Sequence, residues 1–302
     1  MKKICVFGTG GVGGYFGGKI ASRLNDREVY FIARGEHLEQ IRKNGLILNT
    51  ASEKGLVCRP ALATDNPAEI PQCDLVLLSV KSYDLKDCLP HVKRVAGAVG
   101  AILPLLNGVD IVERIRNVVD TAVVLPGCVY VGTHISKPGE ITQDGGDGRI
   151  IFGDDPLGLR YDPAPLIELF RAAGIAHEYQ PDPYPSIWMK YIFIAAYGMV
   201  TAAYRKTLDE VYADNKLRTL ALSVMHEIAA IAERKGVGLP ENAAASSLDK
   251  AKSFPAGTKT SFQRDYEKGG KNESDLFGGT IIRLGRETGI PTPFTNQVFV
   301  RL

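Results

Sequence analysis

A glycine-rich motif close to the N-terminus constrains the fold of this chain more than any other feature. The run Gly8-Thr9-Gly10-Gly11-Val12-Gly13 follows a short apolar segment, residues 4–7, and precedes small and apolar residues that continue to Leu24. A strand, a tight Gly-x-Gly-x-x-Gly turn and a helix in this order form the fingerprint of a dinucleotide-binding fold. In that fold the phosphates bind the free amides at the positive end of the helix. An ordinary glycine-rich turn, the alternative, would not need the flanking strand and helix.

The end of the next strand indicates which dinucleotide is bound. Residues 28–33 form a second apolar run, and Arg34 follows them directly. A site that prefers NAD usually places a carboxylate here to bind the ribose 2′-hydroxyl, whereas an arginine suits the 2′-phosphate of NADP. The nearest acid, Glu36, lies beyond the strand end. We therefore predict NADP(H), with a solvated surface arginine as the alternative reading of Arg34.

Length and composition set the broad class. The chain has 302 residues, enough for two domains, and its 36 Lys and Arg nearly balance its 34 Asp and Glu, so no nucleic-acid or membrane partner is indicated. Its five cysteines show no metal-ligand spacing, which is typical of reduced thiols. No signal peptide precedes the first strand, and no uncharged apolar stretch is long enough to cross a bilayer. We expect a soluble, cytoplasmic protein without a bound metal.

Strand and helix patterns alternate through residue 180 and predict an open, mostly parallel α/β sheet. Residues 74–80 and 101–106 fit buried parallel strands, residues 139–153 suit antiparallel hairpins, and residues 163–173 fit a helix. Three prolines within residues 181–185 exclude regular structure and mark a linker. We expect a doubly wound, Rossmann-type NADP(H)-binding domain at residues 1–182. An all-helical substrate and catalytic domain should follow at residues 183–302.

The most informative residue of the second half is Lys190, in the middle of an apolar helix at residues 187–197. A buried ammonium is costly unless it finds a partner or acquires a lowered pKa, and either condition suits a lysine that transfers protons. The alternative is a lysine that reaches the domain surface and has no function. Further helices are predicted at residues 216–235, 242–251, 274–288 and 294–301.

Other polar residues also lie where chemistry is expected. Lys81 and Asn107 each follow a buried parallel strand, and ligands of open α/β sheets bind beside such strand ends, although polar residues are common there in any case. Ser261 and Glu273 flank a Lys-Gly-Gly-Lys-Asn loop. Glu273 and Asp275 would equally suit the acidic first turn of a helix.

Taken in order along nearly the whole chain, these motifs resemble those of the ketopantoate reductases (2-dehydropantoate 2-reductases). The resemblance is carried by residues 8–13, Arg34, Ser79-Val80-Lys81, Asn107-Gly108, Trp188-x-Lys190, Ser261-Phe262-Gln263-Arg264-Asp265, Glu273-x-Asp275 and Gly289-Ile290-Pro291-Thr292-Pro293. It implies the NADPH-dependent reduction of 2-dehydropantoate to (R)-pantoate, a step in pantothenate biosynthesis.

The resemblance also implies roles for single residues. Lys190 matches the general acid of the family, and Glu273 matches an acid that helps to hold the reacting hydroxyl and the cofactor. Asn107 matches a residue at the nicotinamide and the substrate, and Ser261 a ligand of the substrate carboxylate. The positions that match cofactor contacts are Gly8, Thr9, Gly10, Gly11, Val12, Gly13, Arg34, Lys81, Asn107 and Thr133.

The chain departs from the family pattern in the substrate half. The family often has asparagines four and eight residues after the lysine, where this chain has Ile194 and Gly198, and Leu208 replaces a further polar residue. A pocket that hydrogen-bonds hydroxyl groups rejects analogues without them, and the converse substitution relaxes that preference. A paralogue that reduces a more apolar 2-oxo acid is therefore an alternative, as is a non-catalytic NADP(H)-binding sensor. The oligomeric state stays open, with a homodimer as one alternative.

Overall fold

The computed structural model describes residues 1–98 and 100–302. Contacts between residues divide the chain into two compact units. The N-terminal unit comprises Met1–Leu106 and Ile111–Pro183, and the C-terminal unit comprises Asn107–Asp110 and Tyr184–Leu302. The sequence suggested a single break after residue 182. Residues 107–110 instead pack with the C-terminal helices, because their side chains bond to residues of those helices.

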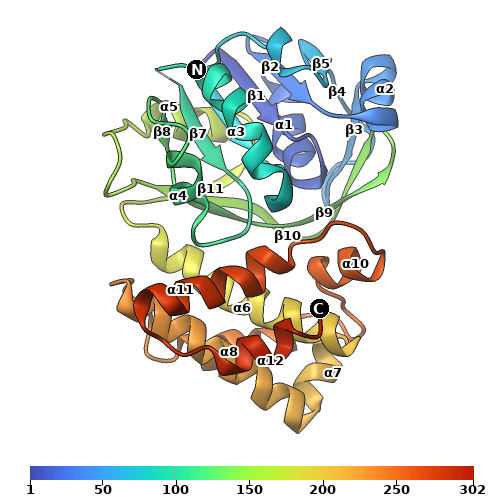
Figure 1. Ribbon diagram of the computed structural model, residues 1–302. Helices are drawn as coiled ribbons and strands as arrows, with labels where there is room; N and C mark the ends of the chain where they lie inside the picture. The colour runs from blue at the N-terminus through green and yellow to red at the C-terminus, as the bar shows by residue number, and fades with distance from the viewer. Residues whose placement is uncertain (99) are drawn as a thin grey trace. The chain divides into compact units, whose positions relative to one another are not determined.

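Six parallel strands form the first sheet of the N-terminal unit (Figure 1). They are β1 (Lys3–Phe7), β2 (Glu28–Ile32), β5 (Leu62–Thr64), β6 (Leu75–Leu78), β7 (Ala101–Pro104) and β8 (Val123–Val124), in the spatial order β5-β2-β1-β6-β7-β8. Counted along the chain, this is the order 3-2-1-4-5-6 of the doubly wound dinucleotide-binding fold. The direction of winding reverses between β1 and β6, which is where ligands bind in such sheets.

A second sheet belongs to the same unit. It contains β3 (Leu46–Asn49), β4 (Leu56–Cys58), β10 (Glu140–Gly153) and β11 (Ala176–Gln180) in the order β11-β10-β3-β4, and β9 (Gly127–Lys137) pairs with β10. The prediction of hairpins within residues 139–153 is wrong, because almost all of that segment is the single strand β10, antiparallel to β9. Its glycines coincide with shifts in register at Gly145 rather than with turns.

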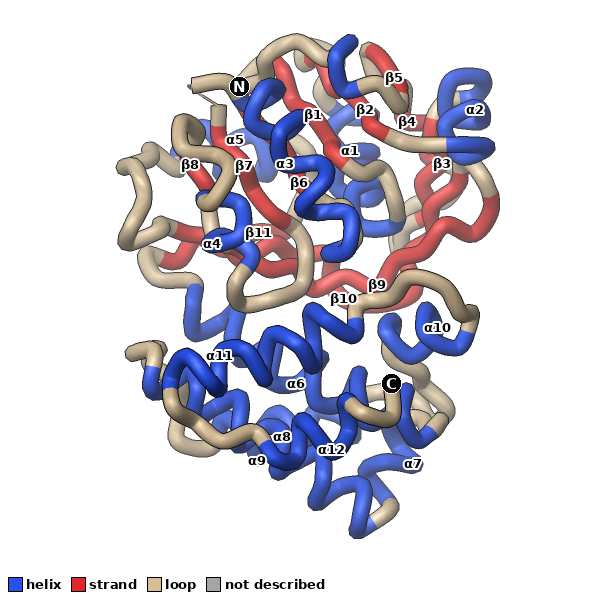
Figure 2. Tube along the Cα trace, viewed as in Figure 1, coloured by secondary structure: helices blue, strands red, loops and turns tan. Residues whose placement is uncertain are grey.

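Helix α1 (Gly11–Arg23) packs on strands of both sheets of the unit (Figure 2). Its small residues allow this close packing, since a Cβ at Gly17 would overlap the Val6 side chain of β1 and one at Gly14 would lie 2.7 Å from Ile141 of β10. The remaining helices of this unit are α2 (Gly35–Asn44), the 3₁₀ turn η1 (Pro67–Glu69), α3 (Ser82–Ala96), α4 (Ile111–Arg116) and α5 (Ala164–Ala172).

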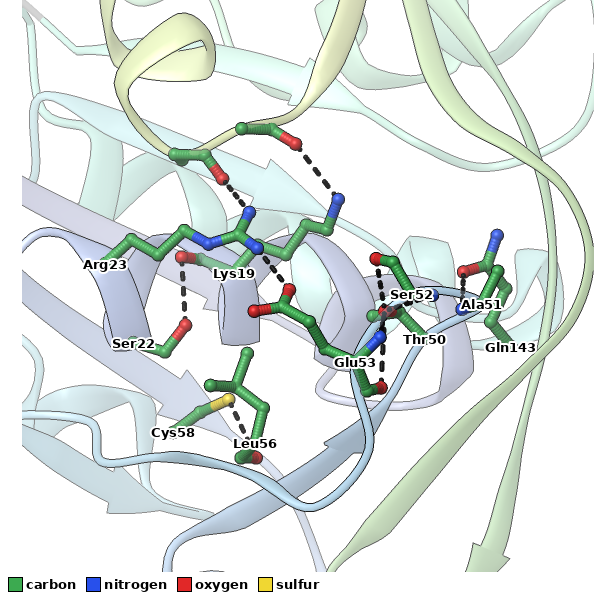
Figure 3. Close-up of polar contacts among 12 residues, drawn as sticks. Lys19, Ser22, Arg23, Thr50, Ala51, Ser52, Glu53, Leu56, Cys58 and Gln143 are labelled. Carbon is green, nitrogen blue, oxygen red and sulfur yellow. Dashed lines mark hydrogen bonds and ion pairs between the residues drawn. The ribbon is translucent and has the colours of Figure 1, made fainter.

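Polar contacts fix the C-terminal end of α1 (Figure 3). Arg23 forms an ion pair with Glu53 and donates a hydrogen bond to the Ala173 carbonyl oxygen at 2.8 Å. One turn earlier, Lys19 Nζ donates to the Gly174 carbonyl oxygen at 3.0 Å. These contacts tie α1 to the β3–β4 connection and to the turn between α5 and β11. The helix that begins at the glycine motif is therefore anchored at its far end.

Helix α6 (Tyr184–Tyr204) is the central element of the C-terminal unit (Figure 1). It packs against α7 (Leu208–Ala213), α8 (Asn215–Arg234), α9 (Ala243–Asp249), α10 (Ser261–Glu267) and α12 (Pro293–Phe299), while α11 (Thr280–Thr288) packs on α8. By length and mean hydropathy α6 could span a membrane. However, 67% of its 18-residue apolar stretch is buried inside the protein, as in a core helix. The predicted fold class, a parallel α/β sheet followed by an all-helical C-terminal part, is confirmed.

Three expectations about the helical part are wrong. Pro185 lies in the first turn of α6, where backbone N–H groups have no acceptor within the helix, so a proline there breaks no helical hydrogen bond. The linker therefore ends before Tyr184. Residues 274–288 do not form one regular helix, because the π-helical turn η3 (Asp275–Gly279) precedes α11. The helix expected at residues 242–251 ends at Asp249 and continues as the 3₁₀ turn η2 (Lys250–Ser253). The short helices α7 and α10 were not predicted.

Candidate active site

The glycine motif forms the loop between β1 and α1, at the carboxyl end of the first sheet. Gly8 has a φ of +99°, which favours glycine, and Ser79 Oγ donates a hydrogen bond to its carbonyl oxygen at 2.8 Å. A Cβ at Gly13 would overlap both that carbonyl oxygen and Ser79 Oγ. The loop is thus closed against the end of β6, and a side chain at Gly13 would force it open.

The residues around this loop fit the phosphates of a dinucleotide. Gly10, the N-cap of α1, has no side-chain cap, and the first turn contains no acidic residue. A Cβ at Gly10 would meet no atom within 4 Å, whereas one at Gly11 would lie 2.8 Å from the carbonyl oxygen of Thr133 on β9. The hydroxyls of Thr9 and Thr133 are buried and have no hydrogen-bond partner among the described residues. Uncapped helix amides, open space and two orphaned hydroxyls form a suitable anion site.

Arg34 and Lys81 lie at the ends of the two strands that flank β1. Arg34 is the N-cap of α2 and Lys81 is the N-cap of α3, and both side chains are exposed. Arg34 Nη1 lies 3.7 Å from Asp84 Oδ2 in the first turn of α3. The N-terminal unit therefore brings the glycine loop, Thr133 and two cations to one edge of its first sheet.

In the C-terminal unit, the structure joins two of the predicted site residues. Lys190 is half-buried on α6, and its Nζ donates a hydrogen bond to Asn107 Oδ1 at 2.7 Å. Asn107 begins the segment 107–110 that packs with the helices. The ammonium in the apolar helix therefore has the polar partner that its partial burial requires.

An ion pair that sequence reasoning missed holds segment 107–110. Arg283 on α11 pairs with Asp110, whose side chain is only 2% exposed, and also with Glu287 one turn further along α11. Nothing in the sequence links Asp110 to a residue 173 positions away. The one available signal is an acid three residues after Asn107 in a segment expected to carry the site. Because Asp110 anchors this segment, the pair supports the position of Asn107.

Glu273 lies in a segment that is bound to α6 beside Lys190. Glu273 is 8% exposed, and its backbone carbonyl oxygen accepts a hydrogen bond from the Phe277 amide at 3.1 Å. Tyr191 Oη lies 2.6 Å from the Leu276 carbonyl oxygen and 3.1 Å from that of Phe277. The residue after Lys190 therefore holds the π-helical turn that follows Glu273. Sequence spacing did not select Tyr191, which reads as one more apolar residue of α6.

Helix α10 packs further along the Lys190 face of α6. Ser261 is exposed at the start of α10, and Thr260, the N-cap, has its Oγ1 3.1 Å from Thr201 Oγ1 on α6. A Cβ at Gly198 would lie 3.6 Å from the Phe262 side chain. Gly198 is two turns, or about 12 Å, from Lys190. The structure therefore brings Ser261 to the Gly198 end of this face.

Metal and thiol chemistry have little support in the described residues. No group of three His, Cys, Asp or Glu side chains there is placed to hold a metal ion. All five cysteines are buried and none of them forms a disulfide, and burial raises the pKa of Cys58, Cys73 and Cys88 to about 12. These thiols are therefore protonated and poor nucleophiles. The polar groups of the C-terminal unit include the ammonium of Lys190, the amide of Asn107 and the carboxylate of Glu273.

Comparison with known proteins assigns this arrangement to a family. Residues 4–156 match the family model of the ketopantoate reductases PanE/ApbA, and residues 184–302 match the model of their C-terminal part. The chain belongs to the ketopantoate reductase family. It is therefore an oxidoreductase, and the family resemblance predicted from the sequence is confirmed.

Individual relatives cover almost the whole chain. The uncharacterized oxidoreductase YkpB of Bacillus subtilis is 29% identical over 301 residues, which cover 99% of this chain and 97% of that protein. The crystal structure of 2-dehydropantoate 2-reductase from Porphyromonas gingivalis is 32% identical with a TM-score of 0.84, covering 99% and 98% of the two chains. A D-mandelate dehydrogenase solved with NADH and anilino(oxo)acetate shares the fold, at 21% identity, a TM-score of 0.86, and 99% and 96% coverage. The fold by itself therefore selects neither the substrate nor the dinucleotide.

Proposed function

We propose that this ketopantoate reductase family member reduces 2-dehydropantoate to (R)-pantoate with NADPH, as a cytoplasmic enzyme of pantothenate biosynthesis. The observation that carries the proposal is the 2.7 Å hydrogen bond from Lys190 to Asn107, because it fixes an ammonium group in the unit that also buries Glu273. The 32% identical protein from Porphyromonas gingivalis is a 2-dehydropantoate 2-reductase, which supports the same substrate.

The N-terminal unit supplies the residues that would hold NADPH. The first-turn amides of α1 and the hydroxyls of Thr9 and Thr133 suit its pyrophosphate. Arg34 suits the 2′-phosphate, with which a guanidinium forms charge-assisted, bidentate hydrogen bonds. Lys81 adds a second exposed cation at the same sheet edge. When bound, NADPH supplies the hydride that the ketone carbon accepts.

The C-terminal unit supplies the proton that ketone reduction also consumes. Lys190 Nζ donates this proton to the ketone oxygen, and its charge stabilises the negative charge that develops on that oxygen. Asn107 Oδ1 accepts one of the three ammonium hydrogens and so fixes the directions of the others. We assign Glu273 to the reacting hydroxyl and Ser261 to the substrate carboxylate, as the family resemblance implies.

A second candidate substrate is a more apolar 2-oxo acid. Ile194 and Gly198 follow Lys190 by one and two turns, and neither side chain can hydrogen-bond a substrate hydroxyl. The aromatic side chain of Phe262 lies opposite Gly198, 3.6 Å from where a Cβ would be. This part of α6 therefore suits a substrate with an apolar branch better than a substrate with a hydroxymethyl group.

A screen of 2-oxo acids, followed by the absorbance of NADPH, tests these assignments. The proposal predicts the highest kcat/KM for 2-dehydropantoate, above branched 2-oxo acids that lack its hydroxyl. A kcat/KM more than about tenfold higher for a branched, hydroxyl-free acid would favour the second candidate, since one unpaired polar group costs about this factor. Tight binding of NADPH without turnover of any 2-oxo acid would instead indicate a non-catalytic sensor.

A further inference from the structure

A histidine outside the predicted site joins three segments around the glycine loop. His37 lies on α2, half-buried, three residues after Arg34. Its Nε2 is 2.9 Å from the Thr9 carbonyl oxygen, and its Nδ1 is 2.9 Å from the amide nitrogen of Gly139 in the β9–β10 turn. An amide can only donate and a carbonyl oxygen can only accept. His37 is therefore the neutral tautomer with its proton on Nε2, and it cannot keep both bonds if Nδ1 is protonated.

The bond to Thr9 fixes the peptide unit that links Thr9 to Gly10. The Thr9 amide already donates to the Ile32 carbonyl oxygen at 2.8 Å, so both polar groups of Thr9 are held. In a trans peptide the carbonyl and the following N–H point in opposite directions. Anchoring the Thr9 carbonyl on His37 therefore aims the Gly10 N–H away from the ring. Among the described residues this N–H donates no hydrogen bond, and the space beside Gly10 is open.

The hydrogen bond from the Gly139 amide joins the same ring to the turn between β9 and β10. Gly139 has a φ of +79°, and a Cβ there would lie 2.6 Å from Gln40 Cβ, so the turn packs closely on α2. The turn leads from β9, whose Thr133 lies against Gly11. Burial lowers the pKa of His37, although the bond to the Thr9 carbonyl oxygen opposes this shift, so the ring is neutral at neutral pH. Both bonds are then present together.

We propose that His37 is a positioning residue for dinucleotide binding, which orients the Gly10 N–H toward the pyrophosphate through the Thr9 carbonyl. This inference rests on the dinucleotide binding in the proposed function. Because the pyrophosphate is common to NADPH and NADH, His37 serves both dinucleotides equally. In this it differs from Arg34, which is assigned to the 2′-phosphate alone.

Two conservative variants separate the two bonds of the ring. The Nε2 of a glutamine occupies nearly the position of histidine Nε2, so His37→Gln keeps the bond to Thr9. The Oδ1 of an asparagine occupies nearly the position of histidine Nδ1, so His37→Asn keeps only the bond to Gly139. His177→Asn is the matched control, because His177 is half-buried in the same unit and its Nδ1 is 2.8 Å from the Ile175 carbonyl oxygen.

The dissociation constants of NADPH and NADH, measured by the fluorescence of the reduced nicotinamide, test the proposal. We expect His37→Ala and His37→Asn to weaken both dinucleotides alike, by about five- to tenfold, as for the loss of one hydrogen bond. His37→Gln and His177→Asn should stay within about twofold of wild type. The kcat should change little in all four variants, and melting temperatures show whether the variants are folded.

Equal binding by the glutamine and asparagine variants would overturn the proposal, because only one of them reaches Thr9. The proposal would also be overturned if His37→Ala raised the dissociation constant of NADPH but not that of NADH. A wild-type protein that binds neither dinucleotide would instead contradict the proposed function, before any variant is compared.

Discussion

Arg34 is the residue that would distinguish the two nicotinamide dinucleotides. It is exposed at the end of β2, and its only described ion pair, with Asp84 at 3.7 Å, is a weak surface contact. An additional phosphate can therefore bind this guanidinium without breaking a strong bond in the protein.

We predict that Arg34→Ala raises the KM for NADPH by about tenfold or more, the effect of losing a charge-assisted contact, and leaves the KM for NADH nearly unchanged. Steady-state kinetics with each dinucleotide measure both values. Asp84→Asn serves as the control, because it removes the acidic partner and keeps the arginine. Equal effects of Arg34→Ala on the two dinucleotides would remove Arg34 from its assigned role.

A buried carboxylate holds the last helix of the C-terminal unit. Glu227 on α8 is 8% exposed, and its carboxylate accepts hydrogen bonds from the amides of Phe294 and Thr295 at 2.7 and 2.9 Å. The hydroxyl of Thr295 donates to the same carboxylate at 2.6 Å. Glu227 thus caps α12 from another helix, and the negative charge is favourable at this helix terminus.

Replacing this carboxylate should destabilise the fold without changing the chemistry. We predict that Glu227→Ala lowers the free energy of unfolding by about 2–3 kcal/mol, because the buried amide of Thr295 and the part-buried amide of Phe294 lose their acceptor. Urea denaturation measures this difference, and Glu233→Ala, at an exposed position of the same helix, should change it by less than about 0.5 kcal/mol. A loss no larger than that of the control would show that solvent satisfies the amides.

The elements that the sequence predicted well have strong local signals. The glycine loop, the strands beside it and the apolar helix around Lys190 each follow from periodicity and turn chemistry. The elements that it missed depend on tertiary contacts. Helix α10 is too short for a periodic pattern, and η3 interrupts a helix where Tyr191 binds its carbonyl oxygens. Likewise, no local pattern shows that Asp110 would pair with Arg283 or that His37 would bridge two loops.

The two units contain the residues for different parts of the proposed reaction. The glycine loop, Arg34, Lys81 and Thr133 belong to the N-terminal unit. Asn107, Lys190, Ser261 and Glu273 belong to the C-terminal unit, although Asn107 follows a strand of the first sheet. Replacing Arg34 is therefore expected to weaken dinucleotide binding, whereas replacing Lys190 is expected to impair proton transfer.

The proposed reaction depends above all on Lys190 as the source of the proton. Its role is tested by the kcat of Lys190→Ala with saturating NADPH and the best 2-oxo acid of the substrate screen, together with the dissociation constant of NADPH. We predict that kcat falls by at least about 100-fold, as for the loss of a general acid, while NADPH binding stays within about twofold of wild type. An unchanged kcat would show that Lys190 is not the general acid.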